Sequence, residues 1–334
     1  MNLFVLGLRR SGTTILYDVL GEDPGLRCFY EPLRENSATI GGGSGARDTD
    51  VFAATRELRE SYRAEHFPEL QVELFNWGGP RAPELELDAE LPDHVAGLLT
   101  ELLGRGPDVA IKETRLHHKL GALAEIDPEA AVVHVVRDPR AVAASMLLGR
   151  RRRTDIYPDA DTFFTARTGR RLWSSRRISA ALIERDAIDL PADIPDFIRP
   201  LIVWRSAYES TAGDGRRLFG DRYAVVRLED LRADPPSELE RVYALIGRPL
   251  ADRVGEWAVA NVHPDAEIHL RDDPRWARAA HLIGIEDELR ETGYGEILEL
   301  EPEPGEPLDL TPPPARSRLS GFIGRARRRR LSER

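Results

Sequence analysis

The sequence predicts an α/β fold, in which a parallel sheet is flanked by helices on both faces. The first segment, NLFVLGL, reads as a short apolar strand that runs through a glycine turn into a helical segment, GTTILYDVLGED. DVAIKE and AAVVHVVRD read as two further strands, and the second is apolar over most of its length. Apolar strands that alternate with helices are typical of parallel sheets that are buried on both faces.

The predicted helices follow from the spacing of apolar residues. In the first, Ile15, Leu16, Val19 and Leu20 share one face, and Gly21 ends the helix. HHKLGALAEID and PRAVAASMLLG are the helices expected after the second and third strands. RYAVVRLEDL predicts a fourth strand, and PSELERVYALIG predicts the helix that follows it.

These elements fit one domain over residues 1–300. A chain of 334 residues with 41% hydrophobic residues can bury a full core. Residues 51 to 105 predict mostly helix, and we expect this insertion to cap the ligand site. Residues 301–334 differ in composition: an acidic, proline-rich linker is followed by a basic tail that we expect to be flexible.

Composition excludes several classes of function. The formal net charge of −10 argues against general nucleic-acid binding, so a site for an anion must be local. The single Cys28 excludes an internal disulfide, and no apolar run approaches the length of about 18 residues that spans a bilayer. No cysteine pair exists, and the adjacent His117 and His118 cannot turn both rings to one metal. We therefore expect a cytoplasmic protein without a metal.

The glycine turn has the frame of a phosphate-binding loop. In the pattern G-x-x-x-x-G-K-[ST], Gly7, Gly12 and Thr14 fit, but Thr13 stands where lysine is expected. Backbone N–H groups of residues 10 to 14, at the start of a helix, would form a cradle for a phosphate, with Arg10 adding a cation. The missing lysine argues against a nucleoside triphosphate.

A second candidate anion site follows the third strand. Arg137 stands at the carboxyl end of this strand, where open α/β sheets bind ligands, and Ser145 lies in the next helix. Both side chains can converge on one phosphate, although a structural ion pair for Arg137 and a packing role for Ser145 are the alternatives. Two separate anion sites suit a nucleotide that is phosphorylated at both its 3′ and 5′ positions.

The strings RRSGTTILYDVLGEDPGLRCFYEPL and VVHVVRDPRAVAASM together resemble the sulfotransferases that use 3′-phosphoadenosine 5′-phosphosulfate (PAPS), most closely the carbohydrate and tyrosylprotein branches. The resemblance covers most of residues 1–300 and implies the sulfotransferase fold, a P-loop NTPase-like parallel sheet. It implies that Arg137 and Ser145 hold the 3′-phosphate. It also implies that the first loop holds the 5′-phosphosulfate through Arg10, Ser11, Gly12, Thr13 and Thr14.

Transfer of a sulfuryl group to a hydroxyl requires a base for the hydroxyl proton. Glu31 is the candidate, because it can return to the mouth of the sheet after the first helix, and Phe29 and Tyr30 beside it would raise its pKa by desolvation. It also matches the glutamate regarded as the base in the carbohydrate and tyrosylprotein enzymes. Lys112, at a strand end, resembles the family lysine that contacts the transferring group.

Other positions leave alternatives open. Leu228 stands where many relatives have the tyrosine of a Y-E-D motif, so the way in which adenine is held cannot be carried over. The string DPRWARAAHL resembles a late segment that closes over the nucleotide, which suggests Arg275 and Trp276 as further contacts, with helix packing the alternative for Trp276. His117 and His118 are alternative bases.

The function predicted is transfer of a sulfuryl group from PAPS to a hydroxyl of a sugar or glycoconjugate, giving 3′,5′-adenosine bisphosphate. A P-loop kinase and a nucleotide-binding protein without chemistry are the alternatives. The tail from Arg316 to Arg334 has eight arginines and one glutamate, with Leu319, Phe322 and Ile323 between them. Such a segment suits peripheral contact with an anionic membrane surface, whereas a solvated tail is the simpler interpretation.

Overall fold

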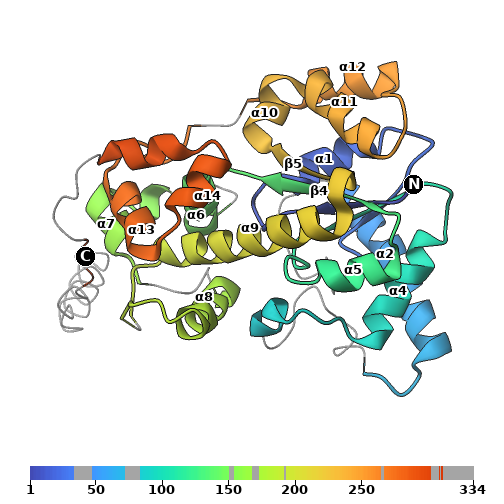
Figure 1. Ribbon diagram of the computed structural model, residues 1–334, viewed down its shortest axis with the longest axis horizontal. Coiled ribbons are helices and arrows are strands. Elements are labelled where there is room, and N and C mark those ends of the chain that lie inside the picture. The colour runs from blue at the N-terminus through green and yellow to red at the C-terminus, as the bar shows by residue number, and fades with distance from the viewer. Residues whose placement is uncertain are drawn as a thin grey trace, which may run out of the picture.

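The computed structural model describes residues 1–33, 47–71, 83–149, 154–167, 173–191, 193–264 and 267–301, together with Leu308 and Leu310. Within these residues, five parallel strands form one sheet in the order β2-β3-β1-β4-β5 (Figure 1). The strands are β1 (Leu3–Leu6), β2 (Arg27–Tyr30), β3 (Val109–Glu113), β4 (Ala131–Val136) and β5 (Tyr223–Arg227). The predicted α/β fold with a parallel sheet is therefore confirmed.

The strand order places a topological switch point at β1. This strand pairs with β3 on one side and with β4 on the other, and both pairings are parallel. The chain leaves β1 toward β2 and later crosses back over β1 to reach β4. Loops that follow β1, β3 and β4 therefore meet at one edge of the sheet, where α/β proteins bind ligands.

Helices cover both faces of the sheet because successive residues of its central strands point to opposite sides. In β1, Leu3 and Val5 belong to one apolar core, and Phe4 and Leu6 belong to the other. The first core is covered by α1 (Thr13–Leu20), α10 (Leu228–Ala233), α11 (Pro235–Leu245) and α12 (Asp252–Asn261). The second is covered by α2 (Arg47–His66), α4 (Asp93–Leu103) and α5 (Leu120–Ile126).

A third core lies beyond the sheet, around the edge-to-face rings of Trp276, Phe164 and Phe197. The long helix α9 (Ile198–Phe219) connects this core to the sheet (Figure 1). The other helices that build it are α6 (Pro139–Leu148), α7 (Ala160–Thr165), α8 (Trp173–Arg185), α13 (Arg275–Ile283) and α14 (Glu286–Glu291), followed by the short helix η4 (Gly295–Leu300).

The structure differs from the sequence prediction at two strand ends. β2 was not expected, because it has only four residues and its first, Arg27, is exposed at the sheet edge. The string LEDL was expected to extend the fourth strand, but the strand ends at Arg227 and the string begins α10. Residues of the predicted insertion form α2, α4 and the short helix η1 (Pro83–Leu87), which agrees with the expected helix content.

The predicted cap splits into two parts. Helix α4 packs against the sheet through Leu98 and Leu99, whereas Glu86 in η1 reaches the carboxyl edge of the sheet. The basic tail lies outside the described residues, and so does most of the proline-rich linker. Among the residues that are described, no helix is both long enough and apolar enough to cross a membrane.

Candidate active site

The phosphate loop joins β1 to α1 and depends on Gly12. Its backbone has a φ of 90°, in the left-handed region that side chains rarely adopt. A Cβ atom at this position would also lie 2.5 Å from Cδ1 of Leu228. Both constraints require glycine, so the loop can turn and at the same time pack under the start of α10.

The amides available for an anion are fewer than the five predicted. The Ser11 amide donates to the Leu8 carbonyl at 3.0 Å, and the Ser11 side chain is buried. Thr13 and Thr14 open α1, where backbone N–H groups have no partner within the helix. The cradle that this loop offers is therefore centred on residues 12 to 14.

The two predicted anion motifs contact each other. A guanidinium nitrogen of Arg137, Nη1, donates to the Arg10 carbonyl at 2.9 Å, so the end of β4 is tied to the phosphate loop. In return, Arg10 Nε donates to Ser145 Oγ in α6 at 2.8 Å. Arg10 itself has a φ of 77°, and these two contacts hold its backbone and its side chain.

A cavity of about 390 Å³ opens at this edge of the sheet. Six of its side chains are arginine or lysine, and Glu31 supplies its one carboxylate among the described residues. Such a lining favours an anionic ligand. The lining residues are Arg9, Arg10, Gly12, Thr13, Thr14, Ile15, Tyr30, Glu31, Lys112, Thr114, Arg115, Arg137, Leu228 and Arg232.

Glu31 and Lys112 form a buried ion pair in the wall of this cavity. Lys112 Nζ donates to Glu31 Oε1, and the two residues are only 1% and 6% exposed, respectively. The Lys112 ammonium also lies 4.2 Å from the centre of the Tyr30 ring. The Tyr30 hydroxyl lies 3.0 Å from Thr14 Oγ1, so the pair is linked to the phosphate loop. Phe29, on the other face of β2, packs into the core.

The Glu31 backbone has a positive φ, and hydrogen bonds from its own amide and from the Leu33 amide hold this conformation. Its φ is 41°, its amide donates to the Lys112 carbonyl at 2.8 Å, and the Leu33 amide donates to Glu113 Oε1 at 2.9 Å. Burial raises the pKa of Glu113 to about 8, and the nearby Glu31 charge adds to the effect. Sequence reasoning missed Glu113, although it follows Lys112 directly in the string AIKET.

Two further arginines of the cavity were also missed. Arg9 and Arg115 both contact the buried carboxylate of Glu86, Arg9 at 3.3 Å. The doubled arginine of the phosphate loop was a signal for Arg9, but its partner is 77 residues away in the sequence. Glu86 therefore joins the insertion to the rim of the cavity.

Ser145 faces a neighbouring cavity of about 360 Å³ rather than the first one. Arg9 and Arg10 line both, so the two hollows lie on either side of these arginines. The other residues that line the second cavity are Met146, Gly149, Ser174 and Ser175. A ligand that extends past Arg10 would reach the Ser145 hydroxyl.

Other predicted site residues lie elsewhere in the described structure. Arg275 is paired with Asp273 and Asp161 at 2.8 Å each, and it does not line either of these cavities. Its assignment as a nucleotide contact stays a prediction. Trp276 is buried in the third core, where its indole N–H donates to the Leu270 carbonyl. This position agrees with the alternative that Trp276 packs between helices.

The two histidines are also away from the cavity lining. His117 is buried, its Nε2 lies 3.1 Å from the Thr114 carbonyl, and burial lowers its pKa. His118 Nε2 lies 3.3 Å from Ser206 Oγ, and burial lowers its pKa to about 4. Neither histidine lines the two cavities, so neither is placed to act as a base on a ligand bound there.

Comparisons with known proteins find a family match in the first part of the chain. Residues 2–154 match the sulfotransferase family, and this stretch runs from β1 past the end of α6. No curated protein matches the chain.

Solved sulfotransferase structures resemble the chain at low identity. STF9 from Mycobacterium avium is 16% identical with a TM-score of 0.47, and the match covers 87% of this chain and 76% of that one. The sulfotransferase domain of the Synechococcus PCC 7002 olefin synthase is 16% identical with a TM-score of 0.41, covering 86% and 94%. Mouse SULT7A1, complexed with PAP, is 12% identical with a TM-score of 0.42, covering 90% and 88%.

The matched stretch contains both predicted anion motifs, which are the phosphate loop and the pair Arg137 and Ser145. Glu31, Lys112, Arg137 and Ser145 all lie within residues 2–154, the stretch that matches the sulfotransferase family.

Proposed function

We propose that the protein transfers a sulfuryl group from PAPS to a hydroxyl of a sugar or glycoconjugate, with Glu31 as the general base. One observation carries the proposal: a single cationic cavity brings together the phosphate loop, Arg137 and the Glu31–Lys112 pair. A site for an anionic donor thus adjoins a carboxylate that can accept a proton.

The residues present fit a nucleotide with phosphates at two positions. Gly12 gives the loop the left-handed turn that leads into α1, and α1 adds the positive end of its helix dipole. The phosphate loop would hold the 5′-phosphosulfate, and Arg137, which follows a different strand and contacts Arg10, would hold the 3′-phosphate. When bound, PAPS supplies an activated sulfuryl group whose leaving group is a phosphate.

The chain's own residues would act on the acceptor and on developing charge. Glu31 accepts the proton of the acceptor hydroxyl at a carboxylate oxygen, which raises the nucleophilicity of that hydroxyl. Lys112 places a fixed positive charge beside the same point, held over Tyr30. Because the pair is nearly enclosed by protein, these charges act at low dielectric.

Thr13 argues against the alternative that the protein is a kinase. The methyl group of this side chain lies 2.6 Å from the position of a Cβ on Gly7, so it packs under the loop. It cannot reach phosphates as the lysine of an ATP-binding loop does.

A ligand-binding comparison with the full chain tests the donor. Because a ligand that binds the folded state stabilises it, 3′,5′-adenosine bisphosphate should raise the melting temperature and ATP with Mg²⁺ should leave it unchanged. Labelled PAPS with a panel of sugars and glycoconjugates then tests the acceptor. Stabilisation by ATP alone would contradict the proposal and favour the kinase.

A further inference from the structure

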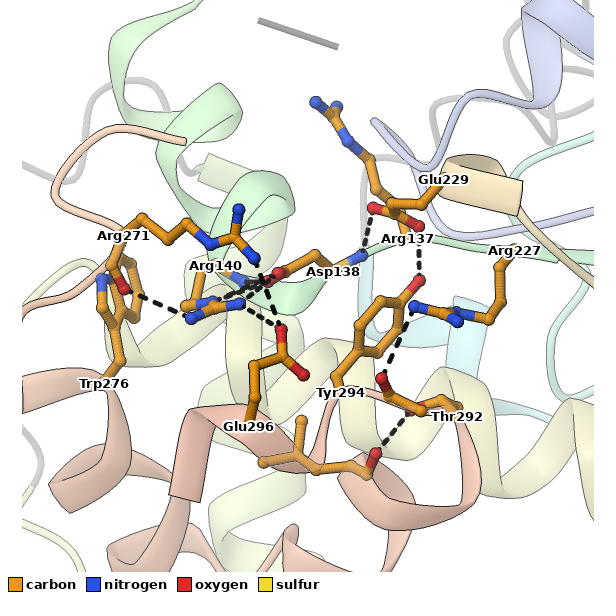
Figure 2. Close-up of polar contacts among 12 residues, drawn as sticks. Arg137, Asp138, Arg140, Arg227, Glu229, Arg271, Trp276, Thr292, Tyr294 and Glu296 are labelled. Atoms are coloured by element: carbon orange, nitrogen blue, oxygen red, sulfur yellow. Dashed lines mark hydrogen bonds and ion pairs between the residues drawn. The ribbon is translucent and has the colours of Figure 1, made fainter. Parts of the chain in front are cut away.

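The peptide group that joins Arg137 to Asp138 is held by two partly buried hydrogen bonds, one at its carbonyl and one at its N–H. The Trp204 indole N–H donates to the Arg137 carbonyl at 3.0 Å, and the Asp138 amide donates to Glu229 Oε1 at 3.1 Å. Figure 2 shows the Arg137 side chain directed away from this network, while its backbone takes part in it. These contacts set the direction in which β4 delivers the Arg137 guanidinium.

Glu229 is in turn held by a residue from the far end of the described chain. The Tyr294 hydroxyl donates to Glu229 Oε2 at 2.6 Å, a short, charge-assisted bond (Figure 2). Tyr294 is only 1% exposed, and the Arg227 guanidinium lies 4.6 Å from the centre of its ring. Burial and the Glu229 charge both raise the pKa of Tyr294, so its hydroxyl stays protonated and remains a donor.

A second contact from the same part of the chain reaches the Asp138 side chain. Arg140 is 1% exposed and donates to both Asp138 carboxylate oxygens. It also donates to Glu296 Oε1 at 2.8 Å and to the Arg271 carbonyl at 3.2 Å (Figure 2). Residues 286–300, which we call the C-terminal strap, therefore hold the turn after Arg137 at its amide and at its carboxylate.

We propose that Tyr294 and Glu296 of the C-terminal strap are positioning residues, which aim Arg137 at the 3′-phosphate of the donor through Glu229 and Arg140. The inference rests on the proposed function, because it assigns a target to Arg137. Neither strap residue lines the cavity, so each acts through the backbone of the turn.

Three features favour positioning over general stability alone. The contacts converge on one turn from a segment more than 150 residues away in the sequence. Both carboxylate oxygens of Glu229 accept hydrogen bonds in this network, Oε1 from the Asp138 amide and Oε2 from the Tyr294 hydroxyl. The Arg137 guanidinium donates to the Arg10 carbonyl in the phosphate loop. A change in the direction of the Arg137 side chain would therefore change the distance between the two anion sites.

The test compares two nucleotides in the full chain by calorimetry, 3′,5′-adenosine bisphosphate and adenosine 5′-monophosphate. In Tyr294→Phe, the preference for the bisphosphate should fall by about three- to thirtyfold, less than the roughly ten- to 150-fold expected for direct loss of a hydrogen bond to a charged group, because Tyr294 acts through the turn. Tyr223→Phe is the matched control, since it removes a partly buried tyrosine contact, 3.0 Å from His134 Nδ1, that lies away from the turn. It should leave the preference unchanged.

Two further variants make the test specific. Glu229→Gln keeps groups that can pair with both the Asp138 amide and the Tyr294 hydroxyl, so it should retain most of the preference that Glu229→Ala loses. In an Arg137→Ala background, Tyr294→Phe should change the preference no further, because the two substitutions act on one interaction.

The outcomes separate the inference from the proposed function. If the wild type prefers the bisphosphate and Tyr294→Phe keeps the same preference, the positioning role is overturned and the donor assignment stays intact. A wild type that binds both nucleotides equally would overturn the donor assignment, and the positioning role with it. An equal loss of preference in Tyr223→Phe would show a structural effect alone and would also overturn the inference.

Discussion

Glu31 and Lys112 share a small volume with Tyr30 and Thr14, and each of these side chains has a contact that limits its movement. The ion pair keeps a carboxylate in a nearly closed pocket, where an unpaired charge would be costly. A hydroxyl that enters must therefore approach a base that is already oriented. The chemistry proposed for the site depends on this one carboxylate.

Glu31→Gln should lower turnover by about 10²- to 10⁴-fold while the affinity for 3′,5′-adenosine bisphosphate stays near that of the wild type. The amide keeps the shape of the side chain but cannot accept the proton. Steady-state rates with labelled PAPS and calorimetry measure the two effects separately. Glu22→Gln, which alters a surface pair with Arg253, is the control. Normal turnover in Glu31→Gln would exclude Glu31 as the base.

Arg137→Ala should weaken binding of the bisphosphate by about 1.5 to 3 kcal/mol, the contribution of a hydrogen bond to a charged group. Adenosine 5′-monophosphate should lose much less, because it has no phosphate at the 3′ position. Titration calorimetry with both ligands gives the comparison. Equal losses would show that Arg137 does not contact the 3′-phosphate.

At the scale of elements, the site is built where three strands end. The phosphate loop follows β1, Lys112 lies near the end of β3, and Arg137 follows β4. These strands are neighbours in the sheet although they are far apart in the sequence. Their pairing brings the phosphate loop and two cations to one edge of the sheet.

Gly12→Ala should destabilise the protein by about 1 to 3 kcal/mol and abolish nucleotide binding, because a side chain must adopt a positive φ and displace Leu228. Gly121→Ala, in α5, is the matched control: its Cβ would meet nothing within 4 Å, and it should be neutral or stabilising by up to about 1 kcal/mol. Chemical denaturation and calorimetry measure both. A Gly12→Ala variant with normal stability and binding would refute the constraint.

Four of the five strands could be predicted from the sequence because each contains an apolar run. In β1, β3 and β4 this run is buried along its whole length, whereas in the edge strand β5 only Val226 is buried. β2 could not be predicted, since an edge strand of four residues carries no periodic signal. The phosphate loop, Glu31, Lys112 and Arg137 were located from motifs, and the structure places them together. The sequence could not indicate the roles of Glu86, Glu229 and Tyr294, because the partner that each contacts is distant in the sequence.

At the scale of the whole molecule, several buried titratable groups make stability depend on pH. Burial lowers the pKa of His134 to about 3 and that of His118 to about 4, so both are neutral in the folded protein at neutral pH. The unfolded chain binds protons at these histidines below its ordinary pKa of about 6.5, so their contribution is lost as pH falls from there. The acid side of the stability profile should therefore slope downward.

Glu113 acts in the opposite direction. Its pKa is raised to about 8 in the folded protein, because the carboxyl is buried beside Glu31 with only Lys112 and two backbone amides in compensation. A raised carboxyl pKa contributes stability that is fully present below the unfolded pKa of about 4.5, and this contribution is lost as pH rises toward 8. The two opposed slopes should place maximum stability in the mildly acidic range.

Glu113→Gln should remove much of the slope on the alkaline side. Between pH 6 and 8, the wild type should lose up to about 1.4 kcal/mol per pH unit relative to the variant, because its carboxyl is protonated when folded and ionised when unfolded. The amide oxygen still accepts from Leu33, so the Glu31 turn is retained. Glu288, whose pKa is raised to about 7, leaves a smaller slope in both proteins. Urea denaturation at a series of pH values between 6 and 8 measures this slope, and Glu240→Gln, at an exposed position, is the control. Parallel stability profiles for wild type and Glu113→Gln would show that Glu113 is already ionised in the folded state.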